Sequence, residues 1–285
     1  EWYSDKSGLL PATRVYDIYE DHAGNEWVLT NNGLGMLAAG NRTIASYFVE
    51  TAKKEKGKGQ FFYVAQEYGN EIFFGSDHGR IWRYQKQGGQ FELLQLPASS
   101  RIVEIKKINE QAILIVTKTD GFFVYDVASK GMEHYEASRL PKAPVRSAYM
   151  DKYSEIWFEQ EVPGTVAHFN AKTKVLKTEV IPVEPTSTDR SRPAFHVHED
   201  IYGTVWVHPY GGGFSRFDRE NNRLQSFYNG LSDANWRFSN KIHSAFSDRQ
   251  GNLWMCTHSK GLEKITFQAS PFRMITPEPH RCLLY

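Results

Sequence analysis

The 285-residue sequence has only two cysteines, Cys256 and Cys282, which are too few for a disulfide framework or a thiolate metal site. Its net charge is only +1, so the chain lacks the basic field by which proteins hold nucleic acids. It has no apolar run near the roughly 18–20 residues that span a bilayer. Its best run, at 112–116, is only strand-sized. No stretch of a dozen residues has a 3.6-residue hydrophobic period, which argues against amphipathic helices.

What the sequence does have is an internal repeat. The pattern Asp, two residues, Gly, two residues, Trp occurs at 21–27, 200–206 and 248–254, and at 151–157 with serine in the glycine position. Two degenerate copies carry isoleucine in the tryptophan position, at Ile72 and Ile113. The six aligned positions are 45, 41, 44, 49 and 48 residues apart, so six units of about 45 residues fill nearly the whole chain.

Each unit combines short runs that are typical of β-strands. Apolar runs of period two precede the aspartates (15–20, 145–150, 194–199 and 242–247), and a second run contains the tryptophan. A third run follows a glycine, as at 122–126 and 214–218, and a fourth closes most units, as at 44–48. Four short strands per 40–50 residues describe a propeller blade. We therefore predict an all-β fold: a β-propeller of four-stranded antiparallel blades with six repeats, either six-bladed or most of a seven-bladed ring.

The repeated residues have structural roles in this interpretation, because a catalytic carboxylate is not needed once in every blade. The aspartate can accept hydrogen bonds from amides of its own turn, the glycine can adopt positive φ, and the tryptophan can pack between adjacent blades. The residues assigned to the structural repeat are Asp21, Gly24, Trp27, Asp151, Trp157, Asp200, Gly203, Trp206, Asp248, Gly251 and Trp254.

The unit resembles the two-component regulator propeller repeat. The best copies are 15–30 with Gly33-Leu34 and 242–257 with Gly261-Leu262, and the resemblance extends over about 15–267. It implies the periplasmic sensor region of a hybrid two-component system from a carbohydrate-degrading gut bacterium. In that family two seven-bladed propellers and a small all-β domain precede the inner membrane. The implied role is to bind an oligosaccharide breakdown product and switch an intracellular sensor histidine kinase, with the full-length protein a homodimer.

The sequence departs from this family in length, since it holds six units. Trp2-Tyr3 resembles the closing strand of an earlier blade, and Glu1 follows neither a methionine nor a secretion signal, so we expect a piece of a longer protein. We expect residues 1–276 to form a single propeller within a larger sensor region. Residues 277–285 should form a connector, because two prolines there disfavour strand pairing. With no kinase segment, this part should be non-enzymatic and need no cofactor.

The predicted topology sorts the loops onto two faces. The turns between first and second strands lie on one face, the turn face. The second-to-third and fourth-to-first connections lie on the other, the variable face, where binding is expected. In the long connection 229–241, Trp236 could stack on a sugar while Arg237 hydrogen-bonds its hydroxyl or acid groups. The alternative is a tryptophan that fills the space under its own loop. The candidate ligand-binding residues are Trp236, Arg237, His208, Tyr210, His258, Lys260, Asn32, His78, Arg146 and Arg192.

Basic residues recur shortly before the first strands and could attract an acidic sugar, although solvated loop ends explain them too. They are Arg14, Arg101, Arg146, Arg192, Arg237 and Lys241. His196 and His198 share one strand face, but His198 occupies a position held by aromatic rings in other units, which favours packing over metal ligation. Cys256 is expected to be a buried small residue.

No nucleophile elbow, zinc-protease motif or phosphate-binding glycine loop is present. The favoured function is therefore a non-catalytic sensor that binds a neutral or acidic oligosaccharide and no nucleic acid. A propeller glycosidase or polysaccharide lyase is the first alternative. A protein-docking propeller, which would use the same variable face, is the second.

Overall fold

The structure is a computed structural model that describes residues 12, 14–49, 60–160, 162, 164–184, 195–230, 238–258 and 260–266. It contains six antiparallel sheets whose strands pair in chain order, five of them four-stranded and the last three-stranded among these residues. We refer to them as blades 1 to 6. Their strands are β1 (Val15–Glu20), β2 (Glu26–Thr30), β3 (Leu34–Leu37), β4 (Ile44–Tyr47); β5 (Phe62–Tyr68), β6 (Glu71–Ser76), β7 (Arg80–Gln85), β8 (Gln90–Gln95); β9 (Ile102–Lys107), β10 (Ala112–Thr117), β11 (Phe122–Asp126), β12 (Met132–Tyr135); β13 (Val145–Met150), β14 (Glu155–Gln160), β15 (Thr165–Asn170), β16 (Val175–Val180); β17 (Phe195–Glu199), β18 (Val205–Pro209), β19 (Phe214–Asp218), β20 (Arg223–Phe227); β21 (Ile242–Ser247), β22 (Leu253–Thr257) and β23 (Gly261–Ile265).

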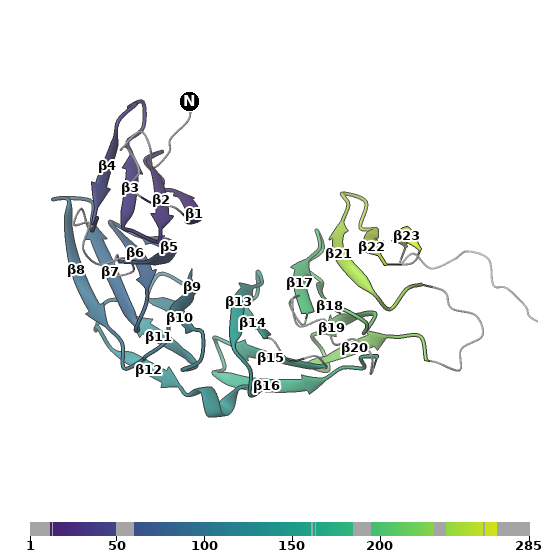
Figure 1. Cartoon of the computed structure of the whole chain (residues 1–285). Coiled ribbons are helices and arrows are strands. Elements are labelled where there is room, and N and C mark those ends of the chain that lie inside the picture. Colours follow the sequence, from purple (N-terminus) through teal and green to yellow (C-terminus); the bar gives the residue numbers. More distant parts are fainter. Residues whose placement is uncertain are drawn as a thin grey trace, which may run out of the picture.

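The blades follow one another along an arc, with the first strand of each blade on the inner side and the last strand on the outer side (Figure 1). The prediction of four-stranded antiparallel propeller blades is confirmed, and β1, β13 and β21 have the predicted bounds. Blades 1 and 6 lie apart at the two ends of the arc, so the described residues do not close a six-bladed ring (Figure 1).

The repeated aspartate organises the turn between the first and second strands. In blade 1, Asp21 Oδ1 accepts hydrogen bonds from the amides of Ala23 and Asn25, at 3.0 and 2.9 Å. Asp21 Oδ2 accepts one from the indole Nε1 of Trp27 at 3.1 Å. The same three contacts recur around Asp151, Asp200 and Asp248. The glycine position has φ near +80° in three of these turns, and Ser154 adopts +67° in the fourth.

Three of the four repeated tryptophans pack against the blade that follows their own. Trp27 shares a buried cluster with Phe62 and Phe74 of blade 2. Trp157 shares one with residues of blade 5, and Trp206 shares one with residues of blade 6. Trp254, in blade 6, is partly exposed instead, because no described residue forms a blade beyond it. Burial of the tryptophan therefore depends on the next blade, which explains its repetition.

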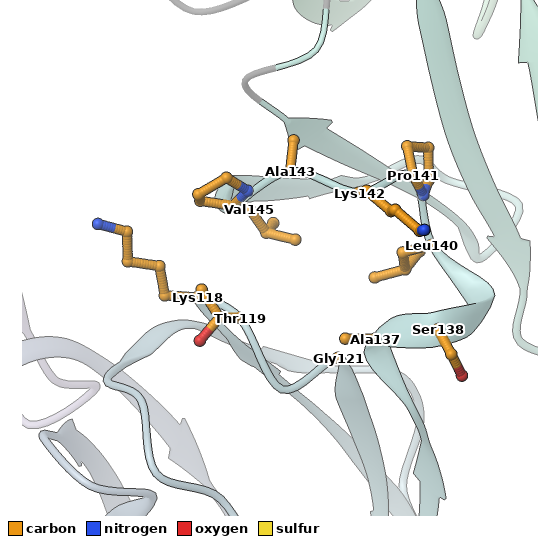
Figure 2. Close-up of a pocket in the computed structure, with 11 residues that line it drawn as sticks. Lys118, Thr119, Gly121, Ala137, Ser138, Leu140, Pro141, Lys142, Ala143 and Val145 are labelled. Atoms are coloured by element: carbon orange, nitrogen blue, oxygen red, sulfur yellow. The ribbon is translucent and has the colours of Figure 1, made fainter.

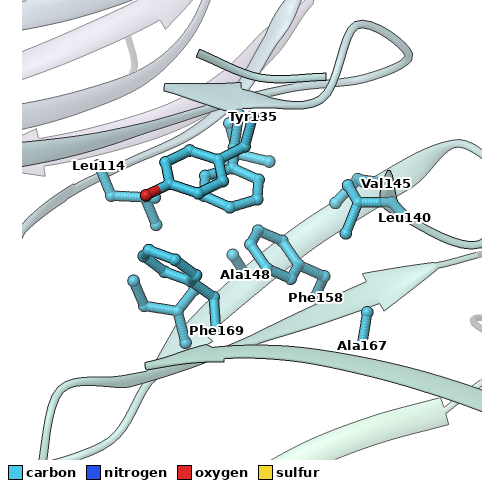
Figure 3. Close-up of a cluster of buried hydrophobic side chains, with 11 residues drawn as sticks. Leu114, Tyr135, Leu140, Val145, Ala148, Phe158, Ala167 and Phe169 are labelled. Atoms are coloured by element: carbon cyan, nitrogen blue, oxygen red, sulfur yellow. The ribbon is translucent and has the colours of Figure 1, made fainter. Parts of the chain in front are cut away.

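Between blades 3 and 4 the core combines phenylalanine and tyrosine rings with aliphatic side chains and includes no tryptophan among the described residues. Phe122 and Tyr135 of blade 3 stack at 4.6 Å, and Phe158 and Phe169 of blade 4 lie against Phe122 at 4.8 and 5.0 Å (Figure 3). The unit with the degenerate repeat at Ile113 thus keeps a tightly packed boundary by placing aromatic residues elsewhere on its strands.

Cys256 is exposed, so the expectation that it is buried was wrong. Side chains alternate along β22, and Cys256 shares the face of Trp254 that no described blade covers. Several predictions lie outside the described residues: the sugar-stacking Trp236 and Arg237, the basic Arg192, and the connector 277–285.

Candidate functional site

The loops on the variable face are held by a repeated threonine at the end of the second strand. The hydroxyls of Thr30, Thr117 and Thr257 donate to the carbonyls of Gly33, Gly121 and Gly261 at 2.7–2.9 Å. The same hydroxyl oxygens accept hydrogen bonds from the amides of Asn32, Asp120 and Lys260. The scaffold thus fixes the backbone at the two candidate ligand-binding positions Asn32 and Lys260.

Five of the six inner strands carry a β-bulge at their second residue, where the strand enters from the variable face. A bulge re-aims the side chain of the extra residue, and bulges are common beside functional sites. β17 pairs regularly, with His196 opposite His208. These bulged residues and His196 lie at the end of the inner strands that faces the variable face, and we call this end the channel mouth. The channel-mouth residues are Tyr16, Tyr63, Val103, Arg146, His196 and His243.

In blades 1 and 2 the channel mouth is aromatic, and blade 3 has Val103 there. The rings of Tyr16 and Tyr63 lie 4.7 Å apart, and Phe61 lies within 6.4 Å of both. The Tyr63 hydroxyl donates to Asp77 at 3.0 Å, and the guanidinium of Arg101 lies 5.0 Å from the Tyr63 ring centroid. Burial and the neighbouring Asp77 carboxylate raise the pKa of Tyr63 above its ordinary value, so this phenol stays a hydrogen-bond donor.

In blades 4 to 6 the channel mouth is rich in histidine. Glu159 links two blades: it accepts hydrogen bonds from the Ser147 hydroxyl and the Val197 amide, at 2.6 and 3.0 Å. His196 Nδ1 lies 4.0 Å from the same carboxylate. Two chains of ring contacts follow, His196–His208 at 5.4 Å, and Tyr210–His243–His258 at 5.4 and 5.8 Å.

Two histidines beneath this surface are held neutral. Burial lowers the pKa of His198 to about 4, and burial together with the neighbouring histidines lowers that of His208 to about 3. The Nδ1 atoms of both rings are buried without a hydrogen-bond partner. Within the described ranges, no three His, Cys, Asp or Glu side chains are grouped to hold a metal ion.

A cavity of about 400 Å³ lies on the same face between blades 3 and 4. It is walled by the loop 118–121 and by the connection 137–145, with Lys118 and Lys142 at its edges and Leu140 and Val145 inside (Figure 2). Gly121 allows the two walls to meet, since a Cβ atom there would lie 2.1 Å from the carbonyl oxygen of Tyr135. The cavity combines an apolar lining with two cationic groups, a composition suited to a small organic ligand.

The structure brings together some of the predicted site residues. His208, Tyr210 and His258 belong to the histidine-rich side, and Lys260 lies in the loop of His258. Arg146 is a channel-mouth residue, whereas Asn32 and His78 lie in the loops of blades 1 and 2. Sequence reasoning missed the aromatic side and the cavity. An aromatic or basic residue recurs at the second position of five of the six first strands, and this pattern was a usable signal for the aromatic side.

Comparisons with known proteins agree with this architecture. A family model described as two component regulator propeller matches residues 9–32 and 237–259, which confirms the resemblance for the first and last repeats. No curated protein matches the chain in sequence.

Among solved structures, the extracellular domains of two proteins described as hybrid two component systems of B. thetaiotaomicron are similar to this chain. Their TM-scores are 0.57 and 0.56 at 16% and 18% identity, and they match 90% and 95% of this chain. The chain spans 34% of the length of each. Virginiamycin B lyase from Staphylococcus aureus is also similar, with a TM-score of 0.57, 15% identity and coverage of 90% of this chain and 85% of the lyase. At these identities the likeness shows the fold. The described part of the chain has no helix of the length and apolarity that a membrane crossing requires.

Proposed function

We propose that this chain, whose first and last blades match two component regulator propeller repeats, is the ligand-sensing extracytoplasmic propeller of a hybrid two-component system. Its ligand is an oligosaccharide bound at the channel mouth, and its output is the state of a cytoplasmic histidine kinase. The observation that carries the proposal is the set of channel-mouth residues, which places tyrosines, an arginine and histidines at one end of the inner strands.

The chemistry of the channel mouth suits a sugar. Tyr16 and Tyr63 offer flat apolar rings on which a pyranose can stack, and the hydroxyl of Tyr63 is fixed by Asp77. Arg101 lies beside Tyr63, and Arg146 is the channel-mouth residue of blade 4. Both guanidinium groups can bind a carboxylate or sulfate on the sugar, so the proposed ligand is an acidic oligosaccharide.

The rest of the proposal follows from the family. The remainder of the sensor region, a further propeller and a membrane-proximal β domain, would connect this part to the inner membrane. The full-length protein would be a periplasmic sensor and a homodimer, with phosphotransfer confined to its kinase. Similarity to extracellular domains of hybrid two component systems supports this placement.

Isothermal titration against defined neutral and uronic-acid oligosaccharides tests the proposal. We expect Tyr63→Ala and Arg146→Ala each to weaken binding at least tenfold, and Arg146→Ala to weaken acidic ligands most, since each removes about 1–3 kcal/mol of contact. Tyr202→Ala and Arg249→Ala are matched controls on exposed turns of the opposite face. Failure of every sugar to bind, in a protein that contains the whole sensor region, would refute the sensing proposal.

The lyase alternative keeps one specific observation in its favour, the histidine-rich side of the channel mouth, because histidine is the commonest general acid–base residue. Product formation from a polysaccharide, lost in His243→Ala, would establish that alternative. Capture of a protein partner that depends on Tyr63, with no sugar affinity, would establish the docking alternative.

A further inference from the structure

The turn face carries a second cavity, far from the channel mouth along the strands. A cleft of about 430 Å³ lies between the β15–β16 hairpin of blade 4 and the β19–β20 hairpin of blade 5. Its polar lining includes Glu155, His168, Asn170, Thr173, Lys177 and Arg219. This volume is within the range of small-molecule sites, roughly 300–1,000 Å³.

The cleft exists where blade 4 departs from the repeat. In blades 1 and 6 the residue four positions after the aspartate is Asn25 or Asn252, whose side-chain amide donates to both carboxylate oxygens. Blade 4 has Glu155 at this position, and a carboxylate cannot make that bond. Arg219, from the next blade, replaces it by donating from Nη2 to Asp151 Oδ2 at 2.6 Å.

Freed from the turn, the Glu155 carboxylate faces two side chains of β15. His168 Nδ1 lies 2.5 Å from Oε1, and Asn170 Nδ2 donates to Oε2 at 2.7 Å. The His168 ring is 1% exposed and stacks on Trp157 at a centroid distance of 4.6 Å. Its Nε2 has no hydrogen-bond partner, with Glu179 Oε1 3.6 Å away.

The fold does not require this network. Blades 1 and 6 close the same turn with a neutral asparagine, whereas blade 4 buries a carboxylate and an imidazole, both of which lose hydration. A neutral asparagine does the same structural work in two other blades, so the buried polar network of blade 4 points to a function. Departures from the residue preferences that suit a fold occur mainly at functional sites.

We propose that this cleft is a binding site for a neutral saccharide. Each Glu155 oxygen keeps a lone pair that can accept a hydrogen bond from a sugar hydroxyl. The Lys177 ammonium donates to the Asn222 carbonyl at 2.8 Å, and its other hydrogens can donate to the ligand. The Arg219 guanidinium, 4.0 Å from the Tyr153 ring centroid, forms a flat wall beside them. Adjacent hydroxyls, each both donor and acceptor, match this alternation of acceptor and donor groups.

This site is independent of the channel mouth, and the test separates the two. We would titrate the 285-residue chain with glucose, galactose, maltose, cellobiose and lactose, using saturation-transfer NMR followed by calorimetry. At least one of these sugars should bind, and Glu155→Asn and Lys177→Ala should each weaken that binding at least tenfold. Thr204→Asn, which places asparagine at the same position of blade 5 outside the cleft, should leave it unchanged.

The variant Glu155→Asn introduces the residue of blades 1 and 6 but removes the acceptor of His168 and Asn170, so we expect its melting temperature to fall. If it fails to fold, Lys177→Ala decides, since this side chain lies at the rim. Absence of binding by all five sugars would overturn the proposal. So would unchanged affinity in Lys177→Ala, or a loss of affinity caused by Tyr63→Ala instead, which would assign the binding to the channel mouth.

Discussion

The pair Trp27→Ala and Trp254→Ala tests whether the repeated tryptophan stabilises the fold through the following blade. Each side chain lies on the second strand of its blade and donates an indole hydrogen bond to the aspartate of the preceding turn. Trp27 Nε1 donates to Asp21 at 3.1 Å, and Trp254 Nε1 donates to Asp248 at 2.8 Å. The two sites therefore differ chiefly in what packs on the indole ring.

The expected magnitudes follow from that packing. Trp27 is 1% exposed, with the rings of Phe74 and Tyr84 both at 4.9 Å. Truncation of such a side chain costs about 3–5 kcal/mol. Trp254 is partly exposed, with the Phe246 ring stacked beside it at 6.3 Å and the Lys264 ammonium 5.3 Å from its ring centroid. We expect a loss of roughly 1–2.5 kcal/mol there, of which about 1 kcal/mol is the hydrogen bond that both variants lose.

Guanidinium unfolding followed by far-UV circular dichroism measures this difference without relying on the fluorescence of the residue removed. The midpoint of Trp27→Ala should fall well below that of Trp254→Ala. Trp206→Ala, which is 3% exposed and packs on blade 6, should behave like Trp27→Ala. Equal losses of stability for Trp27→Ala and Trp254→Ala would contradict a role of the following blade, because they would assign the whole effect to the turn.

Three further outcomes are expected. Hydrogen bonds from Trp254 and Asn252 lower the pKa of Asp248, and in Asp21 similar bonds outweigh the opposing effect of burial. The two carboxylates contribute their full stability above the ordinary carboxyl pKa of about 4, and this contribution is lost as the pH falls below that value. The variant Asp248→Asn should therefore show a smaller decrease of the unfolding midpoint between pH 6 and 2.5. The pKa values of His198 and His208 are lowered to about 4 and about 3, so their effect on stability lies at higher pH. Stability is complete above about pH 6.5 and decreases toward pH 4, because the unfolded chain binds protons that the folded state excludes. The variant His208→Gln should therefore reduce the pH dependence of the melting temperature between pH 7.5 and 4.5. The variant Gly121→Ala should lower the free energy of unfolding, measured by chemical denaturation, by about 2 kcal/mol or more, because φ is +88° and the new Cβ would meet a carbonyl. The control Gly40→Ala has a φ of +73° but open space around the new Cβ, so its free energy of unfolding should fall by about 1 kcal/mol or less.

Local patterns in the sequence were sufficient for the blades. Alternation of apolar residues gives β1, β13 and β21 their observed bounds, since a half-buried strand needs one apolar face wherever it lies in the chain. The second and third units were harder to recognise, because Ile72 and Ile113 replace the tryptophan while Phe74, Phe122 and Phe123 fill the boundaries of those blades.

The candidate sites were harder to predict than the blades, for a geometric reason. A β-bulge is a property of two paired strands, so the special position of Tyr16, Tyr63 and His243 is invisible until the register is known. The exposure of Cys256 likewise depends on whether another blade covers the face of β22 on which it lies.

The repeat, the strand order within each blade and the tight turns could be read from the sequence, because these features depend on residues close together in the chain. The contacts between blades could not, and they became visible when the sheets were packed together. Arg219 completes the turn of Asp151 from 68 positions away, and Glu159 reaches the backbone of Val197 in the next blade. Such contacts are set by the packing of one twisted sheet on the next. For that reason the cleft of blades 4 and 5 lies on the face where the sequence indicated only uniform turns.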